Sequence, residues 1–412
     1  MRKALFSLLL RSSLAVLVLA MVLDSAAWAK PKFKMLRGVP GGLFQGVTFD
    51  AKGNLYSVTN GGGDYNHGTI FQLTPGAHGW SLTTLHSFNG QDGGTPNGGL
   101  IFDAAGNMYG TSPSGGIYNG GNVFEMSPGS RGWTFQDLYD FCQVYHCPDG
   151  GSPTPVVLDS KGRLYGAVAA GGVYGRGGVF RLLPGAGNWT ESVIYSFGKR
   201  PYDAFIPYAA PIFDKASNLY GTTNFGGTNG VGTVFRLERA AGGGWKERLL
   251  YDFCSAGFPL CKDGMRPYAG VIFDAAGNLY GTTTQGGGNK CGETTCGTVF
   301  RLAPTQGGGS WKHKVLYAFP KPENGSFPTG GVILDKAGNL YGATVAGGTG
   351  RCSAGGCGVV YKLAPEKNGK WTYTVLHKFT GADGGQPLGG LTLDRAGNLY
   401  GTAYSEVFEI TP

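Results

Sequence analysis

Five aspartates recur at one place in a repeated pattern, and a ring of carboxylates can hold a cation. Counting back eleven positions from the Asp of successive "DxxGN"-like stretches finds Asp92, Asp203, Asp263 and Asp383, and Asp149 lies one position closer to its own stretch. If the fold brings these carboxylates to one opening, they could bind Ca²⁺ or contact sugar hydroxyls. An Asp followed by Gly and a nearby Pro is also ordinary turn chemistry, and we favour the turn.

Aromatic and cationic residues that do not repeat are the better candidates for ligand binding. Exposed rings beside Arg suit stacking on sugar rings, and they would also suit a peptide. Packing among the loops themselves is the alternative use of such side chains. The candidates are Tyr118, Tyr174, Arg176, Tyr202, Phe225, Arg266 and Tyr268, together with Phe205 and Phe327 in the predicted connections between blades.

Familiar catalytic motifs are absent from the sequence. It contains no H-E-x-x-H, G-x-S-x-G, P-loop or C-x-x-C. The histidines form no cluster, although His67 and His146 lie in predicted loops where one could act as a general base. A polysaccharide lyase or glycosidase stays open as an alternative, and a glycosidase needs two carboxylates about 5–9 Å apart.

The eight cysteines fall into close pairs. In an exported protein such spacing predicts local disulfides, whereas these separations without clustered His are poor for zinc. Disulfides would pin their loops and lower the entropy lost when a ligand binds. The predicted pairs are Cys142–Cys147, Cys254–Cys261, Cys291–Cys296 and Cys352–Cys357.

The elements that position these residues come from a long repeat. The Tyr of "NLYG" or its variant recurs seven times, at Tyr56, Tyr109, Tyr165, Tyr220, Tyr280, Tyr341 and Tyr400. Each period, as in residues 270–319, predicts four strands joined by Gly-rich turns. Four antiparallel strands repeated radially make a propeller blade, so we expect an all-β, seven-bladed β-propeller.

The two ends of the chain complete each other. The last repeat stops after its third strand, in "VFEITP", and residues 33–37 resemble a fourth strand. We expect the N-terminal strand to close the ring, because an unclosed array leaves exposed strand edges. A Trp opens the fourth strand of six repeats, which favours packing between blades over a sugar-binding role.

The variable segments share one face of the predicted blades. The turn between the first and second strands is always short, whereas the second-to-third loops and the connections between blades are long and variable. Those two kinds of segment emerge on the same side, and they hold every cysteine and every candidate above. Loops on a rigid scaffold are where binding usually occurs, so we place the site there.

The N-terminus predicts export. Arg2 and Lys3 precede an apolar run, and Ala27-Trp28-Ala29 fits a signal-peptide cleavage site, which divides the chain into a signal peptide (1–29) and one propeller domain (30–412). The net charge of +8 is scattered, so we expect no nucleic-acid partner. After signal removal we expect a secreted or periplasmic monomer without a membrane span.

The stretch "NLYGTT…GG…GTVFRLAP" resembles the GloVer-type tandem repeat of exported bacterial proteins, and its "DxxGNLY" hairpin is similar to NHL-like repeats. The likeness covers residues 33–412 and implies a surface or secreted location without any established chemistry. The residues favour a non-catalytic propeller that binds carbohydrate or an extracellular protein. It would require no cofactor, and Ca²⁺ would be the ion for the Asp ring.

Overall fold

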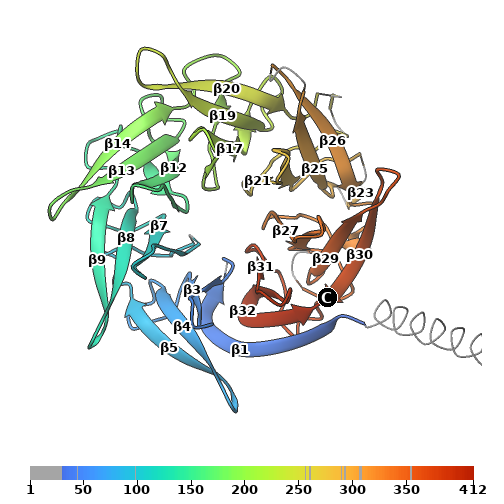
Figure 1. Cartoon of the computed structure of the whole chain (residues 1–412), viewed down its shortest axis with the longest axis horizontal. Coiled ribbons are helices and arrows are strands. Elements are labelled where there is room, and N and C mark those ends of the chain that lie inside the picture. The colour runs from blue at the N-terminus through green and yellow to red at the C-terminus, as the bar shows by residue number, and fades with distance from the viewer. Residues whose placement is uncertain are drawn as a thin grey trace, which may run out of the picture.

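The computed structural model describes residues 30–43, 45–97, 99–255, 257–258, 261–288, 290–291, 294–305, 309–352 and 355–412. The predicted signal peptide, residues 1–29, lies outside these residues. Small antiparallel sheets stand side by side in a ring around a central axis (Figure 1). There are seven such blades, so the all-β, seven-bladed propeller is confirmed.

In blades 1 to 6 the four main strands run in chain order from the axis outward (Figure 1). Blade 1 contains β2 (Thr48–Phe49), β3 (Leu55–Thr59), β4 (Thr69–Gly76) and β5 (Gly79–Ser87). Blade 2 contains β6 (Ile101–Phe102), β7 (Met108–Ser112), β8 (Asn122–Gly129) and β9 (Gly132–Asp140). Blade 3 contains β11 (Val157–Leu158), β12 (Leu164–Ala170), β13 (Gly178–Pro184) and β14 (Trp189–Ser196), with β10 (Gly151–Pro153) added beside β12.

The next three blades repeat this order and carry small additions. Blade 4 contains β16 (Ile212–Phe213), β17 (Leu219–Thr223), β19 (Thr233–Arg239) and β20 (Trp245–Asp252), beside the pair β15 (Ala204–Phe205) and β18 (Phe225–Gly226). Blade 5 contains β21 (Ile272–Phe273), β22 (Leu279–Thr283), β25 (Thr298–Pro304) and β26 (Trp311–Ala318), beside β23 (Lys290–Cys291) and β24 (Thr294–Thr295). Blade 6 contains β27 (Val332–Leu334), β28 (Leu340–Thr344), β29 (Val359–Pro365) and β30 (Trp371–Lys378), preceded by a 3₁₀ turn at Pro322–Asn324.

Blade 7 joins the two ends of the chain. It contains β31 (Thr392–Leu393), β32 (Leu399–Thr411) and β1 (Lys32–Leu43). Thr411 Oγ1 lies 2.9 Å from Asn398 Oδ1, so β32 folds back on itself and supplies both middle strands. β1 pairs with its second half, with Phe33 opposite Ile410, and takes the place of the fourth strand (Figure 1).

The repeated "DxxGN" stretch forms the turn between the first two strands of a blade. Asp50 Oδ1 accepts hydrogen bonds from the backbone N–H groups of Lys52 and Asn54 at 2.8 and 2.9 Å. Its Oδ2 accepts from Asn54 Nδ2 at 2.7 Å and from the Tyr56 hydroxyl at 3.1 Å. The side chain thereby replaces missing backbone partners, which is why Asp and Asn hold this short turn in register.

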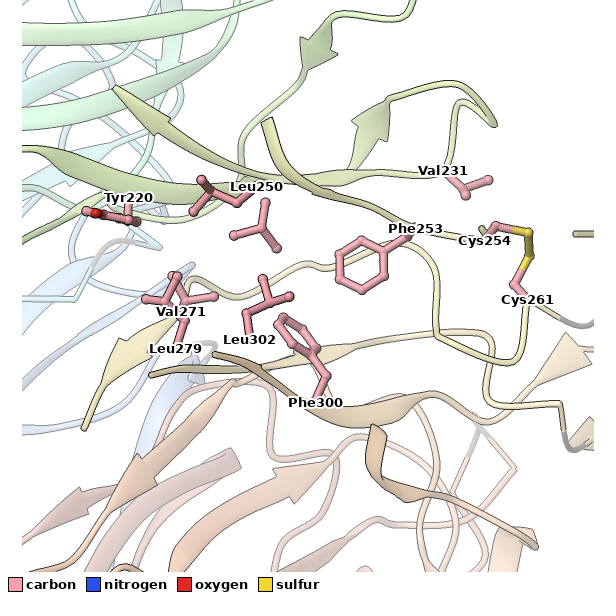
Figure 2. Packing of buried hydrophobic residues seen from close by; sticks show 11 residues of the cluster. Tyr220, Val231, Leu250, Phe253, Cys254, Cys261, Val271, Leu279, Phe300 and Leu302 are labelled. Carbon is pink, nitrogen blue, oxygen red and sulfur yellow. A yellow bond between two sulfur atoms is a disulfide. The ribbon is translucent and has the colours of Figure 1, made fainter. Parts of the chain in front are cut away.

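The core consists of clusters that each join two neighbouring blades. Figure 2 shows the cluster between blades 4 and 5, where Leu250 and Phe253 meet Phe300 and Leu302. An equivalent cluster unites Leu36 of β1 with residues of blade 1, so the ring is packed at its closure as well. The recurring Trp also joins blades: Trp133 packs edge-on against Tyr56 of the preceding blade, at 5.7 Å between centroids. Inter-blade packing by the Trp column is confirmed.

Candidate functional site

The axis of the ring opens into a pocket on the face that carries the variable loops. Its volume is about 380 Å³, and every blade contributes to its lining. The lining residues that carry polar or aromatic side chains are Gln45, Asn60, Asn97, Tyr208, Tyr268 and Thr329. Most of them lie just before the first strand of a blade, where the connection reaches the axis. We call this pocket the channel mouth.

Two tyrosines form the aromatic part of the channel mouth. The rings of Tyr208 and Tyr268 stack at 4.9 Å between centroids with 30° between their planes. They come from the connections that enter β16 and β21, and they stay 38% and 43% exposed. Burial, and then the neighbouring Tyr208, raises the pKa of the Tyr268 hydroxyl, so it remains a neutral donor and acceptor at physiological pH.

A second feature lies beside the mouth, over blades 3 to 5. The rings of Phe205 and Phe225 stack at 5.6 Å with 11° between their planes. Arg176 lies over Phe205 at 4.8 Å from its centroid, and Arg266 lies over Phe225 at 4.1 Å. The four side chains form a continuous column that we call the Arg–Phe stack.

Backbone contacts between loops hold the Arg–Phe stack in place. Phe205 and Phe225 are paired residues of the short β15–β18 sheet. Ile206 donates its backbone N–H to the Arg176 carbonyl at 3.0 Å, which binds the connection to the preceding blade's loop. The Arg266 carbonyl accepts the Thr284 N–H at 3.1 Å. Each side chain therefore projects from an anchored segment.

The predicted aromatics are only partly brought together. Tyr268 lines the channel mouth, and Arg176, Phe225 and Arg266 join in the Arg–Phe stack. Tyr118, Tyr174 and Tyr202 are exposed on loops of blades 2 and 3, outside both features. Tyr208 was not among the predicted residues, yet it follows the recurring Pro as Tyr268 does, and that shared place was the signal for it.

The five aspartates do not form a ring at the channel mouth, which corrects that part of the metal-site prediction. None of them is among the residues that line it. Asp92 and Asp383 accept hydrogen bonds from His86 and His377, each at 3.0 Å. In the part of the chain that the structure describes, no three His, Cys, Asp or Glu side chains gather as a metal site would require.

The other three aspartates are likewise bound within their own connections. Asp149 and Asp263 accept from the hydroxyls of Tyr139 and Tyr251, at 3.1 and 2.7 Å. Asp203 accepts the backbone N–H of Lys199 at 2.9 Å and its own neighbour's N–H. Four of the five carboxylates hold their connection against the outer strand through a Tyr or His of that strand, whereas Asp203 accepts backbone N–H groups of its own connection. This is the turn role that we favoured.

Two buried glutamates lie near the aspartates of the connections. Burial raises the pKa of Glu247 to about 9, and hydrogen bonding to Asp203 adds to the effect. The Tyr195 hydroxyl of the preceding blade donates to Glu247 Oε2 at 3.0 Å. Burial likewise raises the pKa of Glu191 to about 8. The hydrogen bond from Tyr195 makes Glu247 a link between two blades, and neither Glu247 nor Glu191 lines the channel mouth.

Disulfides pin three of the variable segments. Cys142–Cys147 and Cys254–Cys261 close turns in connections, and Cys352–Cys357 closes one in the second-to-third loop of blade 6. Cys296 is also disulfide-bonded, whereas the side chain of its predicted partner, Cys291, lies outside the described residues. Such bonds are typical of proteins from oxidising compartments. Over the described ranges, no helix is long and apolar enough to cross a membrane.

Comparison with known proteins identifies the family of the repeat and shows a related fold. The family described as the Gloeobacter/Verrucomicrobia repeat matches residues 33–200 and 152–409. An extracellular domain from B. thetaiotaomicron, provisionally described as part of a hybrid two-component system, is similar with a TM-score of 0.57 and 13% identity, over 92% of this chain and 39% of that one. This likeness shows the fold alone.

A second solved structure is more distant. A protein with a provisional assignment as a gluconolactonase has a TM-score of 0.43 and 15% identity, over 93% of this chain and 92% of that one. No curated protein sequence matches the chain.

Proposed function

The chain belongs to the Gloeobacter/Verrucomicrobia repeat family, and on that premise we propose that it is an exported binding propeller that recognises carbohydrate at its channel mouth. The observation that carries this proposal is the exposed pair of Tyr208 and Tyr268 at the mouth. Flat aromatic faces suit the apolar faces of sugar rings, and their hydroxyls suit the sugar's own hydroxyls.

The polar residues around the tyrosines support the same ligand class. Gln45, Asn60 and Asn97 contribute to the lining, and amides both donate and accept hydrogen bonds. A pocket of mixed aromatic and amide character is the usual form of a small-ligand site. A glycosidase would need two facing carboxylates, and the lining residues in the described ranges include no Asp or Glu. Binding is therefore the function that this geometry supports best.

Three variable segments on the same face as the mouth are suited to binding, because disulfides reduce the conformational entropy that they would lose when a ligand binds. The disulfide in each of three variable segments limits its conformations before a ligand arrives. The same bonds support export, since they persist outside the reducing cytosol. An extracellular protein is the other partner that these loops could meet, and a chain that binds no polysaccharide would favour it.

The test screens residues 30–412 against soluble polysaccharides and records both binding and polymer length. We expect binding with the polymer left intact. Tyr208→Ala and Tyr268→Ala should each weaken it at least about tenfold, as loss of a central aromatic does. Tyr65→Ala is the matched control, because Tyr65 is an exposed tyrosine on a loop of blade 1 outside the mouth. Shortened polymer, or equal losses from all three variants, would overturn the proposal.

A further inference from the structure

The aromatic pair of the Arg–Phe stack has no counterpart at the equivalent described positions of blades 2, 3, 5 and 6. In these four blades two residues also lie opposite each other at the place where Phe205 meets Phe225 in blade 4. The equivalent bridges are Gly94 with Ser114, Gly151 with Ala170, Met265 with Gln285, and Ser326 with Ala346. The blade thus forms this bridge without any aromatic pair, so the fold itself gives no reason for two phenylalanines here.

The two guanidinium groups are positioned but not neutralised. Among the described residues, ion pairs are formed by His86, Arg163, Arg236 and His377, and neither Arg176 nor Arg266 takes part in one. Each instead lies on a phenylalanine ring. A guanidinium that stacks on a ring keeps its N–H groups at its edge, where they can meet a planar carboxylate in two parallel hydrogen bonds.

The Arg–Phe stack and the channel mouth form neighbouring parts of one surface. Phe205 precedes Tyr208 by three residues, and Arg266 precedes Tyr268 by two. Asn224 Nδ2 donates to the Pro267 carbonyl at 3.2 Å, which fastens the loop of Phe225 to the connection that carries Tyr268. An extended ligand seated on the tyrosines would therefore pass the two arginines.

We propose that the ligand is an acidic polysaccharide, whose uronate carboxylates bind Arg176 and Arg266 while a neighbouring sugar ring stacks on Tyr208 and Tyr268. This inference rests on the proposed carbohydrate-binding function and specifies its ligand class. Arg is the side chain best matched to a carboxylate, and the phenylalanines hold it in place before binding. A neutral glycan would leave both cations without a partner.

The test compares polygalacturonate and alginate with the same polymers after methyl esterification, which removes the charge and keeps the sugar rings. Binding to residues 30–412 is measured by titration calorimetry at low and moderate salt. We expect at least one acidic polymer to bind about tenfold or more tighter than its ester, and less tightly as salt rises. Arg176→Gln and Arg266→Gln should each weaken binding of that polymer about tenfold and leave its ester unaffected.

Arg131→Gln is the matched control. It removes the same charge from the exposed turn between β8 and β9, on the opposite face, and should leave all affinities unchanged. Melting temperatures of the three variants should stay within a few degrees of the parent's, because Arg176→Gln and Arg266→Gln each remove only one cation–π contact and no ion pair among the described residues.

The outcomes separate the two proposals. Equal affinity for acidic and esterified polymer, with no effect of either Arg substitution, would overturn the acidic ligand and leave the carbohydrate-binding function standing. Absence of binding to any polysaccharide would overturn both. If poly-glutamate binds with the same dependence on Arg176 and Arg266 while the polysaccharides do not, the occupant is an acidic protein segment and the glycan assignment is wrong.

Discussion

At the scale of single residues, Glu247 links a buried proton to stability. Its carboxyl lies between blades, where the Tyr195 hydroxyl donates to it and Asp203 is a neighbour, and burial raises its pKa to about 9. Above pH 7 an unfolded Glu is ionised, whereas Glu247 in the fold keeps its proton. The folded state then binds more protons than the unfolded state, so stability falls as pH rises.

We therefore expect the free energy of unfolding to fall between pH 7 and 9, by at most about 1.4 kcal/mol per pH unit from this residue. Glu247→Gln, which keeps the shape without the charge, should flatten the profile measured by urea denaturation. Glu191, with a pKa near 8, contributes in the same direction, so the double Gln variant should be flatter still. If the free energy of unfolding of both variants falls with pH as steeply as that of the parent, these two glutamates are not the cause of the pH dependence.

At the scale of elements, the Gly of "LYG" has a packing role that can be tested. In the structure, an aromatic ring from the third strand covers this Gly. A Cβ on Gly281 would lie 2.7 Å from Phe300 Cζ, and one on Gly221 would meet Phe235 at the same distance. The second strand therefore needs Gly where the third strand carries a large aromatic.

Gly281→Ala should destabilise the protein by about 1–3 kcal/mol, the usual cost of overpacking, as measured by denaturant midpoint. Adding Phe300→Leu should recover part of that loss, because it removes the clashing ring. Gly242→Ala is the control: a Cβ there meets no atom within 4 Å, and its backbone needs no positive φ. If Gly242→Ala lowers the denaturant midpoint as much as Gly281→Ala does, the loss of stability does not come from a clash between strands.

The connections show where prediction from sequence stops. Their recurring Asp and Pro are visible in the repeat, and so is the non-repeating Tyr268. The place of Tyr208 after the recurring Pro was visible too, but its stacking on Tyr268 was not, because a repeat gives the place of a residue along the chain and not which rings from adjacent blades stack. The contacts of Asp203 could not be predicted either, because its partners are backbone groups and a Glu of the fourth strand. Fold was therefore predictable, and the site only in part.

At the scale of the whole molecule, seven similar clusters of described residues join neighbouring blades, and two of them include residues of β1. Leu36 and Val39 of β1 pack with Leu55 and Phe71 of blade 1 and with Val407 of blade 7. β1 also covers the edge of β32. Removing β1 would leave the edge of β32 unpaired and would also expose the core cluster between blades 7 and 1, so the ring would no longer be closed.

A chain that begins at residue 45 should consequently melt at a lower temperature than residues 30–412 and associate through the bare edge of β32. Calorimetry and size-exclusion chromatography measure the two effects. A peptide of residues 30–43 added during refolding should restore both the melting temperature and the monomer, because it supplies the missing strand.

Phe33→Ala is the milder variant: it removes the ring that stacks on His377 at 3.8 Å, so it should lower the melting temperature without association. A truncated chain that stays monomeric and equally stable would show that blade 7 closes the ring with its own strands.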